Sequence, residues 1–350
     1  MEKYYTRACN FYYGATSKLK IKNKLALALH GDKDISFDYL ELISRKFVKK
    51  IYFKDIKKLN KNLRKKVYSD IKKITKIKKF KKLNLSKKPL IMGILNLTPD
   101  SFSDGGKYIK KKNGINHAKK LISDGCDIID IGGESTRPNS KTINKNIEWK
   151  RINPTISKLY RLKKFISLDT RKSSIMKKGF KYGINLINDV SGLDYDVNTI
   201  DFIKKYKIPF VINHIQGSPK NMQKNPKYKN VLLDIYDYFE KKISTIRKNG
   251  IKHNNILIDP GIGFGKNLKH NITLISKISI FHSLGFPILV GVSRKKFIKD
   301  ISGANDSKER IGGTVSTVLF CILQGVQILR VHDVNEIKQS IKVFKSINND

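Results

Sequence analysis

The sequence has 350 residues, of which 39% are hydrophobic and 29% charged, with a formal net charge of +43. This length and apolar content suffice for a large buried core, so one large domain with an appendage, or two domains, are expected. No uninterrupted apolar run reaches the roughly 18 residues of a membrane span, and residues 1–30 lack the apolar core of a secretory signal. We therefore expect a globular, cytoplasmic protein that does not bind membranes.

The three cysteines indicate neither disulfides nor a zinc site. Cys9, Cys126 and Cys321 are odd in number, far apart in the chain and without the paired spacing of zinc ligands. We expect ordinary reduced thiols.

The basic charge suggests nucleic-acid binding as one interpretation, because Lys and Arg neutralise phosphates. However, only 11 of the 72 basic residues are Arg, and Arg is the side chain that recognises phosphates and bases with two parallel hydrogen bonds. The excess of Lys, together with only six Ala, indicates a bias in overall composition. We expect no specific nucleic-acid partner.

Residues 1–88 form a Lys-rich extension of unknown role. They contain 27 basic and 7 acidic residues, a net charge of +20. Within 49–88, apolar residues recur at steps of three and four, which predicts an amphipathic helix packed on the main body. A helix that binds a membrane surface or a partner is the alternative. We expect the extension to dock on the outside of the main domain. The periodic apolar positions are Ile56, Leu59, Leu63, Val67, Ile71 and Ile74.

Residues 89–350 repeat one pattern, in which a short apolar run is followed by a polar or Gly-rich loop and then by a helical stretch. Eight such runs predict eight strands, and the segments between them are long enough for right-handed crossovers. Eight strand and helix pairs in about 260 residues predict an α/β fold, a (β/α)8 TIM barrel. A doubly wound open sheet is the alternative, but no GxGxxG follows the first strand. The runs are 89–96, 126–133, 164–170, 184–189, 208–214, 254–261, 286–295 and 326–333.

Polar residues follow every predicted strand. In a barrel the C-terminal ends of the strands meet on one face, where active sites are built. A single Asp or Asn there often only caps a helix or forms a turn, but such residues after all eight strands indicate a functional site. The residues are Asn96; Glu134, Thr136 and Arg137; Asp169; Asn188 and Asp189; His214; Asp259; Ser293, Arg294 and Lys295; and Arg330, His332 and Asp333.

These residues divide into two chemical sets. Asp169, Asn188 and Asp259 offer acceptors and one amide, which suit a flat, nitrogen-rich heterocycle with N–H donors. The second set is cationic and suits a phosphate or a carboxylate. A ligand with a polar ring at one end and an anionic group at the other is therefore predicted. The second set comprises Arg137, Arg294, Lys295, Arg330 and His332.

Several longer motifs identify a family. "GILNLTPDSFSDGG", "DIIDIGGESTRP", "SLDT", "IND", "HIQGSP" with "MQ", "LIDPGIGFGKN", "GVSRK" and "RVHDV" resemble dihydropteroate synthase in order and spacing over residues 89–347. The resemblance implies a barrel that condenses 6-hydroxymethyl-7,8-dihydropterin diphosphate with 4-aminobenzoate, giving 7,8-dihydropteroate and diphosphate for folate synthesis. It also implies Mg²⁺ as cofactor, these small molecules as substrates, and a homodimer formed through the last helices.

The resemblance assigns a role to each matched residue of the site. It implies pterin binding by Asp169, Asn188, Asp259, Phe264, Lys295 and Arg330; diphosphate binding by Asn96, Arg330 and His332; and Mg²⁺ binding by Asn96. It implies 4-aminobenzoate binding by Thr136, Arg137, Pro138 and Ser293. Asp100, Ser101 and Asp104 match the first mobile loop, which folds over the reacting centre, so that Asp100, Asp104 and Lys295 are the predicted catalytic residues.

The predicted mechanism is a dissociative displacement. The lone pair of an aromatic amine is delocalised, so departure of diphosphate must drive the reaction, helped by Mg²⁺ and cationic side chains. A potent general base is not required, which fits a sequence without a Ser-His-Asp arrangement.

One position departs from the family pattern. Asn213 stands before the His of the fifth strand, where many members have an apolar residue, often Met. A buried amide there needs a hydrogen-bond partner.

The same residues bear on four alternative functions. A pterin-binding methyltransferase module has no use for "STRP", "SRK" and "RVHD", and a barrel that has lost its activity would show lost site residues. An RNA-binding protein would use the basic extension. A fusion with a second folate-pathway enzyme would need a longer extension with its own catalytic clusters.

Overall fold

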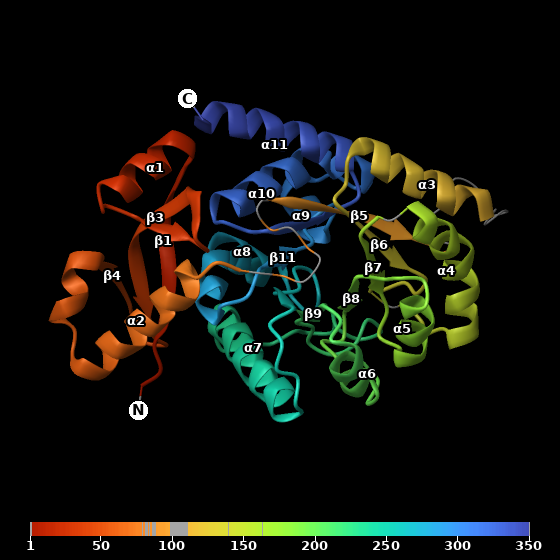
Figure 1. Cartoon of the computed structure of the whole chain (residues 1–350), viewed down its shortest axis with the longest axis horizontal. Helices are drawn as coiled ribbons and strands as arrows, with labels where there is room; N and C mark the ends of the chain where they lie inside the picture. Colours follow the sequence, from red (N-terminus) through yellow and green to blue (C-terminus); the bar gives the residue numbers. More distant parts are fainter. Residues whose placement is uncertain are drawn as a thin grey trace.

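The computed structural model describes residues 2–78, 80, 83, 85, 89–98, 111–138, 140–162 and 164–349. Its main body is a parallel eight-stranded sheet in the order β10-β9-β8-β7-β6-β5-β12-β11, curled into a nearly closed barrel (Figure 1). A single parallel bridge between Ile258 and Ile288 joins the two edges, β10 and β11. This closure confirms the predicted barrel and rules out a doubly wound open sheet. The strands are β5 (Leu90–Asn96), β6 (Ile128–Gly132), β7 (Ile166–Asp169), β8 (Leu186–Asp189), β9 (Phe210–Asn213), β10 (Ile256–Asp259), β11 (Leu289–Val290) and β12 (Ile328–Val331).

A helical layer surrounds the barrel and connects its strands. Asn residues begin several of these helices, because their side chains accept a hydrogen bond from a free backbone N–H of the first turn, as Asn230 does from Leu233 N at 3.2 Å. The sixth helix is divided into α8 and the 3₁₀ segment η4. The helices are α3 (Lys111–Asp124), α4 (Lys145–Leu159), α5 (Ser173–Phe180), α6 (Thr199–Tyr206), α7 (Val231–Lys248), α8 (Leu268–Ser276), α9 (Lys296–Ser302), α10 (Ile311–Leu323) and α11 (Val334–Asn349), with 3₁₀ segments η3 (Tyr160–Leu162), η4 (Ile278–Leu284) and η5 (Lys308–Arg310).

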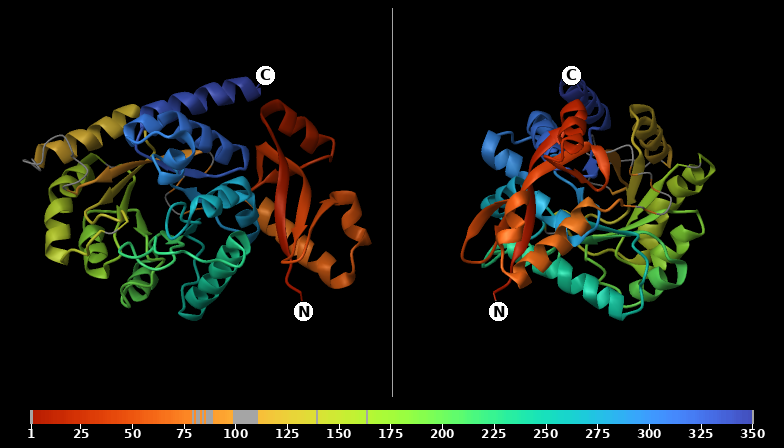
Figure 2. Two further views of the ribbon diagram at one scale, coloured as in Figure 1. Left: turned by 180° about the vertical axis from the view of Figure 1, so that it is seen from behind. Right: turned by 60° about the vertical axis from the view of Figure 1, so that its left-hand side comes forward.

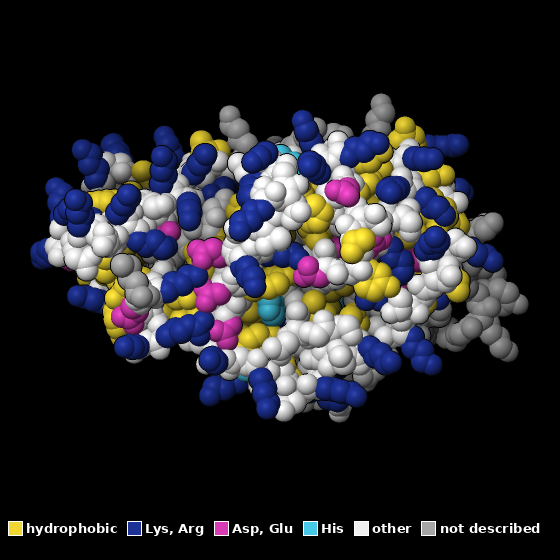
Figure 3. Space-filling view, turned by 90° about the horizontal axis from the view of Figure 1, so that it is seen from below, with side chains coloured by type: hydrophobic (Ala, Val, Ile, Leu, Met, Phe, Trp, Pro, Cys, Tyr) yellow, Lys and Arg dark blue, Asp and Glu magenta, His cyan; other side chains and the backbone are white. Residues whose placement is uncertain are grey.

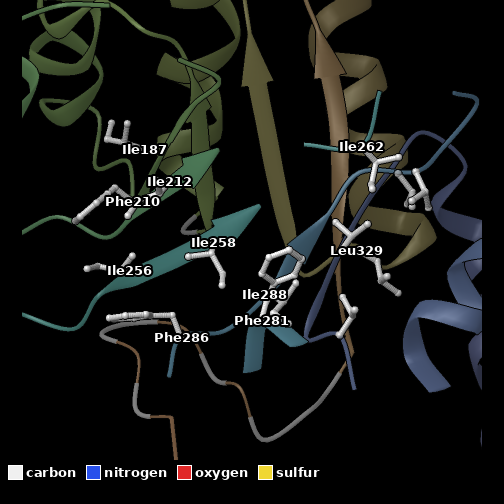
Figure 4. Packing of buried hydrophobic residues seen from close by; sticks show 14 of the residues in the cluster. Ile187, Phe210, Ile212, Ile256, Ile258, Ile262, Phe281, Phe286, Ile288 and Leu329 are labelled. Atoms are coloured by element: carbon white, nitrogen blue, oxygen red, sulfur yellow. The ribbon is translucent and has the colours of Figure 1, made fainter. Parts of the chain in front are cut away.

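Alternation along the strands separates two hydrophobic layers. The outer layer packs between strands and helices, and Figure 4 shows part of it, with Ile187, Ile212 and Ile258 on successive strands and Ile288 just before β11. The inner layer fills the lumen at the N-terminal ends of the strands, where residues of the connecting segment close it. This layer comprises Phe80, Leu83, Leu85, Leu90, Met92, Ile128, Leu186, Val211, Leu257, Leu289 and Ile328.

Residues 2–78 form a compact unit with its own core, built on an antiparallel sheet. Its long central strand β3 (Asp32–Ile43) pairs with β1 (Tyr5–Tyr13), β2 (Leu27–Leu29) and β4 (Val48–Tyr52). The sheet was not predicted from the sequence. The remaining elements are α1 (Gly14–Lys22), η1 (Phe53–Lys58) and α2 (Lys61–Thr75).

The predicted helix over 49–88 is only partly correct. The helix spans Lys61–Thr75, capped by Asn60, whereas residues 48–52 are a strand and 53–58 a 3₁₀ turn. The six periodic apolar residues nevertheless all pack in the core of this unit. The apolar face was therefore assigned correctly, and the start of the helix was not.

The unit docks beside the barrel against η4, α7 and α11 (Figures 1 and 2). Tyr5 is fully buried and meets the Tyr236 ring edge-on at 5.1 Å, and the Tyr13 hydroxyl donates to the Ile322 carbonyl at 2.6 Å. All residues of η4 are buried beneath the unit and the barrel. The interface is thus a continuation of the protein core.

Ion pairs lie beside this apolar contact, at α7. Figure 3 shows Lys and Arg side chains over the whole face that it presents, with a row of acidic side chains near the junction of the unit and the barrel. Asp237 on α7 accepts hydrogen bonds from Lys3 at 2.6 Å and Arg45 at 2.9 Å. No helix of the described residues is long and apolar enough to cross a membrane.

Candidate active site

The lumen changes from apolar to polar at the C-terminal ends of the strands. Residues two positions beyond the inner hydrophobic layer face the same way, because side chains alternate along a strand. On β6, for example, Asp130 follows Ile128, and on β8 Asn188 follows Leu186. The ring comprises Asp130, Asn188, Asn213, Asp259 and Arg330, each two positions beyond this layer, together with Asn96, Asp169 and Ser293 at or just beyond the ends of β5, β7 and β11.

Arg330 lies at the centre of the ring, held between two carboxylates. Its Nε donates to Asp130 Oδ2 at 2.6 Å and its Nη2 to Asp169 Oδ2 at 2.8 Å. The side chain of Asp130 is fully buried, that of Asp169 is 11% exposed and that of Arg330 is 17% exposed. Burial raises the pKa of Asp169, and the nearby Arg330 opposes this effect. The guanidinium is thereby fixed in one orientation.

Asn188 and Asp259 complete the acceptor set on the other side of the ring. Asn188 Nδ2 donates to Asp130 Oδ2 at 3.0 Å, so its amide oxygen is the group that it offers to a ligand. Asp259 Oδ1 accepts from Gly261 N at 2.8 Å, and burial raises the pKa of Asp259 to about 6. Gly261 has φ +68° and a Cβ there would lie 1.9 Å from the His214 carbonyl oxygen, so the turn that orients Asp259 requires glycine.

Lys295 and Phe264 lie together at the rim. The Lys295 ammonium is 4.2 Å from the centre of the Phe264 ring, a cation–π contact. Burial, then the charge of Arg330, lower the pKa of Lys295 to about 8, although Asp259 and Asp169 favour its charged form. Near neutral pH this Lys is a cation with a proton that it releases easily.

Ser293 and His332 form a pair on adjacent strand ends. The His332 backbone N–H donates to Ser293 Oγ at 3.2 Å, and Ser293 Oγ lies 3.1 Å from His332 Nδ1. Burial and the surrounding cations lower the pKa of His332 to about 3, so the imidazole is neutral. If Nδ1 accepts from Ser293, the proton is on Nε2, which is then a donor for an anionic ligand.

Arg294 is paired with another residue of the protein. Its guanidinium makes a two-pronged ion pair with Asp333, with Nε at 2.9 Å from Oδ2, and the backbone N–H donates to Thr314 Oγ1 at 3.0 Å. The sequence placed Arg294 among the cations for phosphate or carboxylate. In the structure it ties the end of β11 to the end of β12, and so positions Ser293 and Lys295.

Asn96 ends β5 next to Gly132, where its carboxamide could face a metal. A Cβ on Gly132 would lie 3.6 Å from Asn96 Oδ1 and 3.5 Å from Asp169 Oδ2, so the glycine leaves space between these two oxygens. Among the described residues no group of three or more His, Cys, Asp or Glu could hold a metal. An amide oxygen fits Mg²⁺, which is commonly bound by one or two protein oxygens together with substrate phosphates and water.

The loop after β6 carries the residues predicted to bind 4-aminobenzoate. Thr136 is half-buried, whereas Arg137 and Pro138 are exposed at the rim. The loop contains a turn in which Ser140 N donates to the Arg137 carbonyl at 3.1 Å. Asp100, Ser101 and Asp104, predicted for the first mobile loop, lie outside the described residues.

Asn213 is 3% exposed and takes part in the ring of the site. Its Nδ2 donates to the Val190 carbonyl at 3.1 Å, while its Oδ1 has no hydrogen-bond partner among the residues described here. Of the two polar groups of this amide, Nδ2 therefore has the expected partner, and Oδ1 has none among the described residues.

Two other strand-end residues have structural roles. His214 lies against Lys266, whose Nζ is 3.0 Å from His214 Nδ1, and meets the Tyr238 ring edge-on. Burial, and to a smaller extent the charge of Lys266, lower the pKa of His214 well below its ordinary value. Asp189 accepts hydrogen bonds from Ser191 N and Oγ and so closes the turn after β8.

Sequence reasoning missed Asp130. It lies in the middle of the run "CDIIDIGG", whereas the predicted site residues all lie at the C-terminal ends of the runs or just after them. Its signal was a lone carboxylate two positions from Ile128, on the lumen face of a strand that is otherwise apolar on that side.

Known proteins match the barrel part of this chain. The family model described as "Pterin binding enzyme" matches residues 92–332. Dihydropteroate synthase of Escherichia coli (strain K12) is 38% identical over 259 residues, covering 74% of this chain and 91% of that protein. The Neisseria meningitidis serogroup C enzyme of the same name is 40% identical over 264 residues, covering 74% and 93%.

Solved structures agree. Yersinia pestis dihydropteroate synthase with a sulfonamide drug complex superposes with a TM-score of 0.72 at 37% identity, covering 77% of this chain and 97% of that chain. The Xanthomonas albilineans enzyme in complex with 7,8-dihydropteroate gives 0.69 at 30% identity, covering 77% and 96%. The family match spans the barrel and leaves out residues 2–78.

Proposed function

The chain belongs to the pterin-binding enzyme family, and we propose that it condenses 6-hydroxymethyl-7,8-dihydropterin diphosphate with 4-aminobenzoate, the dihydropteroate synthase reaction of folate biosynthesis. The observation that carries this proposal is the ring of acceptors around Arg330, in which Asp169, Asn188 and Asp259 face one end of the lumen. These three acceptors can pair with the N–H groups of a heterocycle, whereas the two carboxylates would repel a phosphate at the same place.

The acceptors bind the pterin. Its amino group and ring N–H are donors, which match the carboxylates of Asp169 and Asp259 and the amide oxygen of Asn188. Phe264 and the aliphatic part of Lys295 provide apolar surface for the ring. Arg330, fixed by Asp130, keeps the Asp169 carboxylate in place.

The leaving diphosphate interacts with cationic and neutral donors. Lys295 supplies positive charge, His332 supplies a neutral N–H and Arg330 lies beside both on the β12 side of the ring. These groups stabilise the charge that develops on the diphosphate as its bond to the methylene carbon breaks.

Asn96 would hold Mg²⁺ through its amide oxygen, together with oxygens of the diphosphate. When bound, Mg²⁺ neutralises the leaving group.

The second substrate enters over the rim. The loop with Thr136, Arg137 and Pro138 and the Ser293 side chain bind 4-aminobenzoate, with the Arg137 guanidinium available for its carboxylate. The bond between the methylene carbon and diphosphate breaks first, and the amine then adds to that carbon and releases one of its protons to solvent. The depressed pKa of His332, about 3, makes that imidazole a weak base, which fits a step driven by the leaving group.

The protein acts as a homodimer in this proposal. Large apolar side chains are exposed on α10 and α11: Phe320 is 44%, Leu323 41%, Val343 55% and Ile347 71% exposed. A second copy covering this face would remove them from water. Light scattering should give twice the chain mass, and Phe320→Glu should give the monomer mass.

A cytoplasmic location is proposed as well. Cys9, Cys126 and Cys321 are all free, and burial raises the pKa of each thiol to about 12, which leaves them as unreactive thiols. Free thiols suit a reducing compartment.

An end-point assay tests the reaction. Purified full-length protein is incubated with both substrates and Mg²⁺, and dihydropteroate and diphosphate are measured, with the metal omitted as a control. Metal-dependent formation of both products in equal amounts supports the proposal. Folded protein that forms neither product contradicts it.

A further inference from the structure

A buried cluster of four charged side chains lies directly behind the loop after β6. It contains Glu134 at the start of that loop, Glu148 on α4, and Arg171 and Lys172 after β7, and each of these side chains is at most 9% exposed. Two acidic and two basic groups make the cluster neutral, as a buried group of charges requires. The reaction described above assigns no role to it.

Every oxygen of the two carboxylates is occupied within the protein. Glu134 Oε1 accepts from Lys172 Nζ at 2.9 Å and from the Ile143 backbone N–H at 3.0 Å, and Oε2 accepts from Arg171 Nε at 2.8 Å. Glu148 accepts from Thr170 at 2.5 Å and from Lys172 at 2.5 Å. Neither carboxylate has an oxygen left for a substrate, so the cluster acts through what it holds in place.

Glu134 joins the two ends of the loop. Its own backbone begins the loop, and its carboxylate binds the backbone of Ile143 at the other end. Burial would raise the pKa of Glu134, but Arg171, the Ile143 N–H and Lys172 together lower it, so the carboxylate is charged at neutral pH. The chain between these ends carries Thr136, Arg137 and Pro138.

Arg171 connects this loop to its neighbour on the other side. Its Nη2 donates to Thr142 Oγ1 at 2.9 Å, in the last part of the β6 loop. Its guanidinium lies 4.0 Å from the centre of the Tyr195 ring, which belongs to the loop after β8. A planar group with several donors makes these contacts at once, which a Lys ammonium cannot do.

We propose that Glu134 and Arg171 are positioning residues that fix the loop bearing Thr136, Arg137 and Pro138 in the conformation that accepts 4-aminobenzoate. This inference rests on the proposed reaction and adds to it which residues outside the site set the affinity for one of its two substrates. The pterin site is held by a different set of contacts around Arg330. We call the contacts that Glu134 and Arg171 make with this loop the clamp. Loss of the clamp should therefore affect the KM values for the two substrates unequally.

Arg171→Lys tests the proposal with little change in charge. It keeps a cation beside Glu134 and removes the second donor and the stacking on Tyr195. We expect KM for 4-aminobenzoate to rise about tenfold, because small displacements of positioning groups are costly. KM for the pterin diphosphate should stay within about twofold. Equal changes in both KM values, or no change in either, would overturn the proposal.

Arg247→Lys is the matched control. Arg247 also donates through several hydrogen bonds, to the carbonyls of Ile251 at 2.8 Å and His253 at 2.7 Å, but before β10, at the N-terminal end of the barrel. It should leave both KM values unchanged. Thr142→Val is a second variant, at an exposed position, which removes one hydrogen-bond acceptor of Arg171 and keeps all four charged side chains of the cluster, and it should also raise KM for 4-aminobenzoate.

Hydrogen exchange measured by mass spectrometry separates this proposal from the reaction itself. Peptides that cover the β6 loop, including the Ile143 amide, should exchange faster in Arg171→Lys than in the unsubstituted protein and in Arg247→Lys. This result is expected even if the protein makes no dihydropteroate, in which case the reaction fails and the clamp stands. If the variant is active and has unchanged exchange and unchanged KM values, the positioning role of Glu134 and Arg171 is contradicted and the proposed reaction is not.

Discussion

Arg330 and Asp130 form a buried ion pair at 2.6 Å inside the barrel, with the Asp130 side chain fully excluded from solvent. The same arginine reaches Asp169 at 2.8 Å, so one guanidinium links β6, β7 and β12. A charge that is already paired and oriented before substrate arrives needs little reorganisation during the reaction. Asp130 thus matters for the pterin site although it is the more deeply buried of the two acids.

Asp130→Asn should weaken the pterin site without a change in size. The amide oxygen can still accept from Arg330, but the charge that balances the guanidinium is lost. We expect kcat/KM to fall by about tenfold or more and the free energy of unfolding by about 3 kcal/mol, as for other broken buried pairs. Steady-state kinetics and urea unfolding measure the two effects.

Asp127→Asn is the control for this prediction. Asp127 accepts from Ile91 N at 2.8 Å at the opposite end of the same barrel. The kcat/KM of the Asp127→Asn variant should equal that of the unsubstituted protein. An Asp130→Asn enzyme with normal kcat/KM would show that Arg330 does not need this partner.

Lys295 predicts an alkaline limit to activity. Its pKa is lowered from 10.5 to about 8, so the positive charge near the diphosphate is lost as the pH rises through about 8. We expect kcat/KM for the pterin diphosphate to decline above that pH. In Lys295→Arg, where the charge persists, the decline should move to higher pH, and an identical profile in the two proteins would assign it to another group.

The same shift predicts the effect of pH on stability. Between about 8 and 10.5 the unfolded chain holds the Lys295 proton more tightly than the folded chain does. The contribution of Lys295 to the free energy of unfolding should therefore increase with pH across this window, and it should be absent in Lys295→Met.

Asn213→Met should be tolerated. Asn213 Oδ1 is buried without a partner among the described residues, so removing the amide relieves a desolvation penalty while losing the Nδ2 bond to Val190. We expect the free energy of unfolding to change by no more than about 1 kcal/mol. We expect kcat/KM within about threefold of the unsubstituted protein, as for loss of a minor contact. Asn188→Leu provides the contrast, because it removes the bond to Asp130 and should impair turnover severely.

Tyr5→Ala should destabilise the whole protein. Tyr5 is fully buried between the N-terminal unit and α7, and its hydroxyl donates to Asp237 at 2.9 Å. Loss of this ring should lower the free energy of unfolding by about 3 to 5 kcal/mol. Because the interface continues the core, the unit and the barrel should unfold in one transition. Tyr68→Ala, at a position 47% exposed on α2, should change stability by less than about 1 kcal/mol.

The sequence was sufficient to predict the barrel, because short apolar runs that end in polar residues and alternate with helical stretches are a local property. The polar ends of the strands also converge as predicted, since all C-terminal ends of parallel strands meet on one face. For Asp169, Asn188 and Asp259 the predicted position and the observed ring agree.

Pairwise partners could not be predicted in this way. Arg294 does not pair with the acids that follow it most closely in the chain, and its partner Asp333, 39 residues away, becomes a neighbour only because β11 pairs with β12. The same holds for Glu134 and Arg171, which are 37 residues apart. Residue type predicted which charges gather at the site, and the topology decides which of them neutralise each other.

The extension was interpreted mainly from its charge. Lys residues dominate its composition, which hid the alternation in β3 and the aromatic content of β1, both typical of strands. The amphipathic pattern around Val67 was clear because its apolar positions lie three and four residues apart.

The most direct test of the central claim compares the steady-state kinetics of the unsubstituted protein with those of Asp169→Asn, using both substrates and Mg²⁺. The substitution keeps the size of the side chain and removes the charge that pairs with Arg330 and accepts from the pterin. We predict measurable dihydropteroate synthesis by the unsubstituted protein and a loss of kcat/KM of about a hundredfold or more in the variant. Equal kcat/KM values in the two proteins, both correctly folded, would contradict the assignment of this ring as the pterin site.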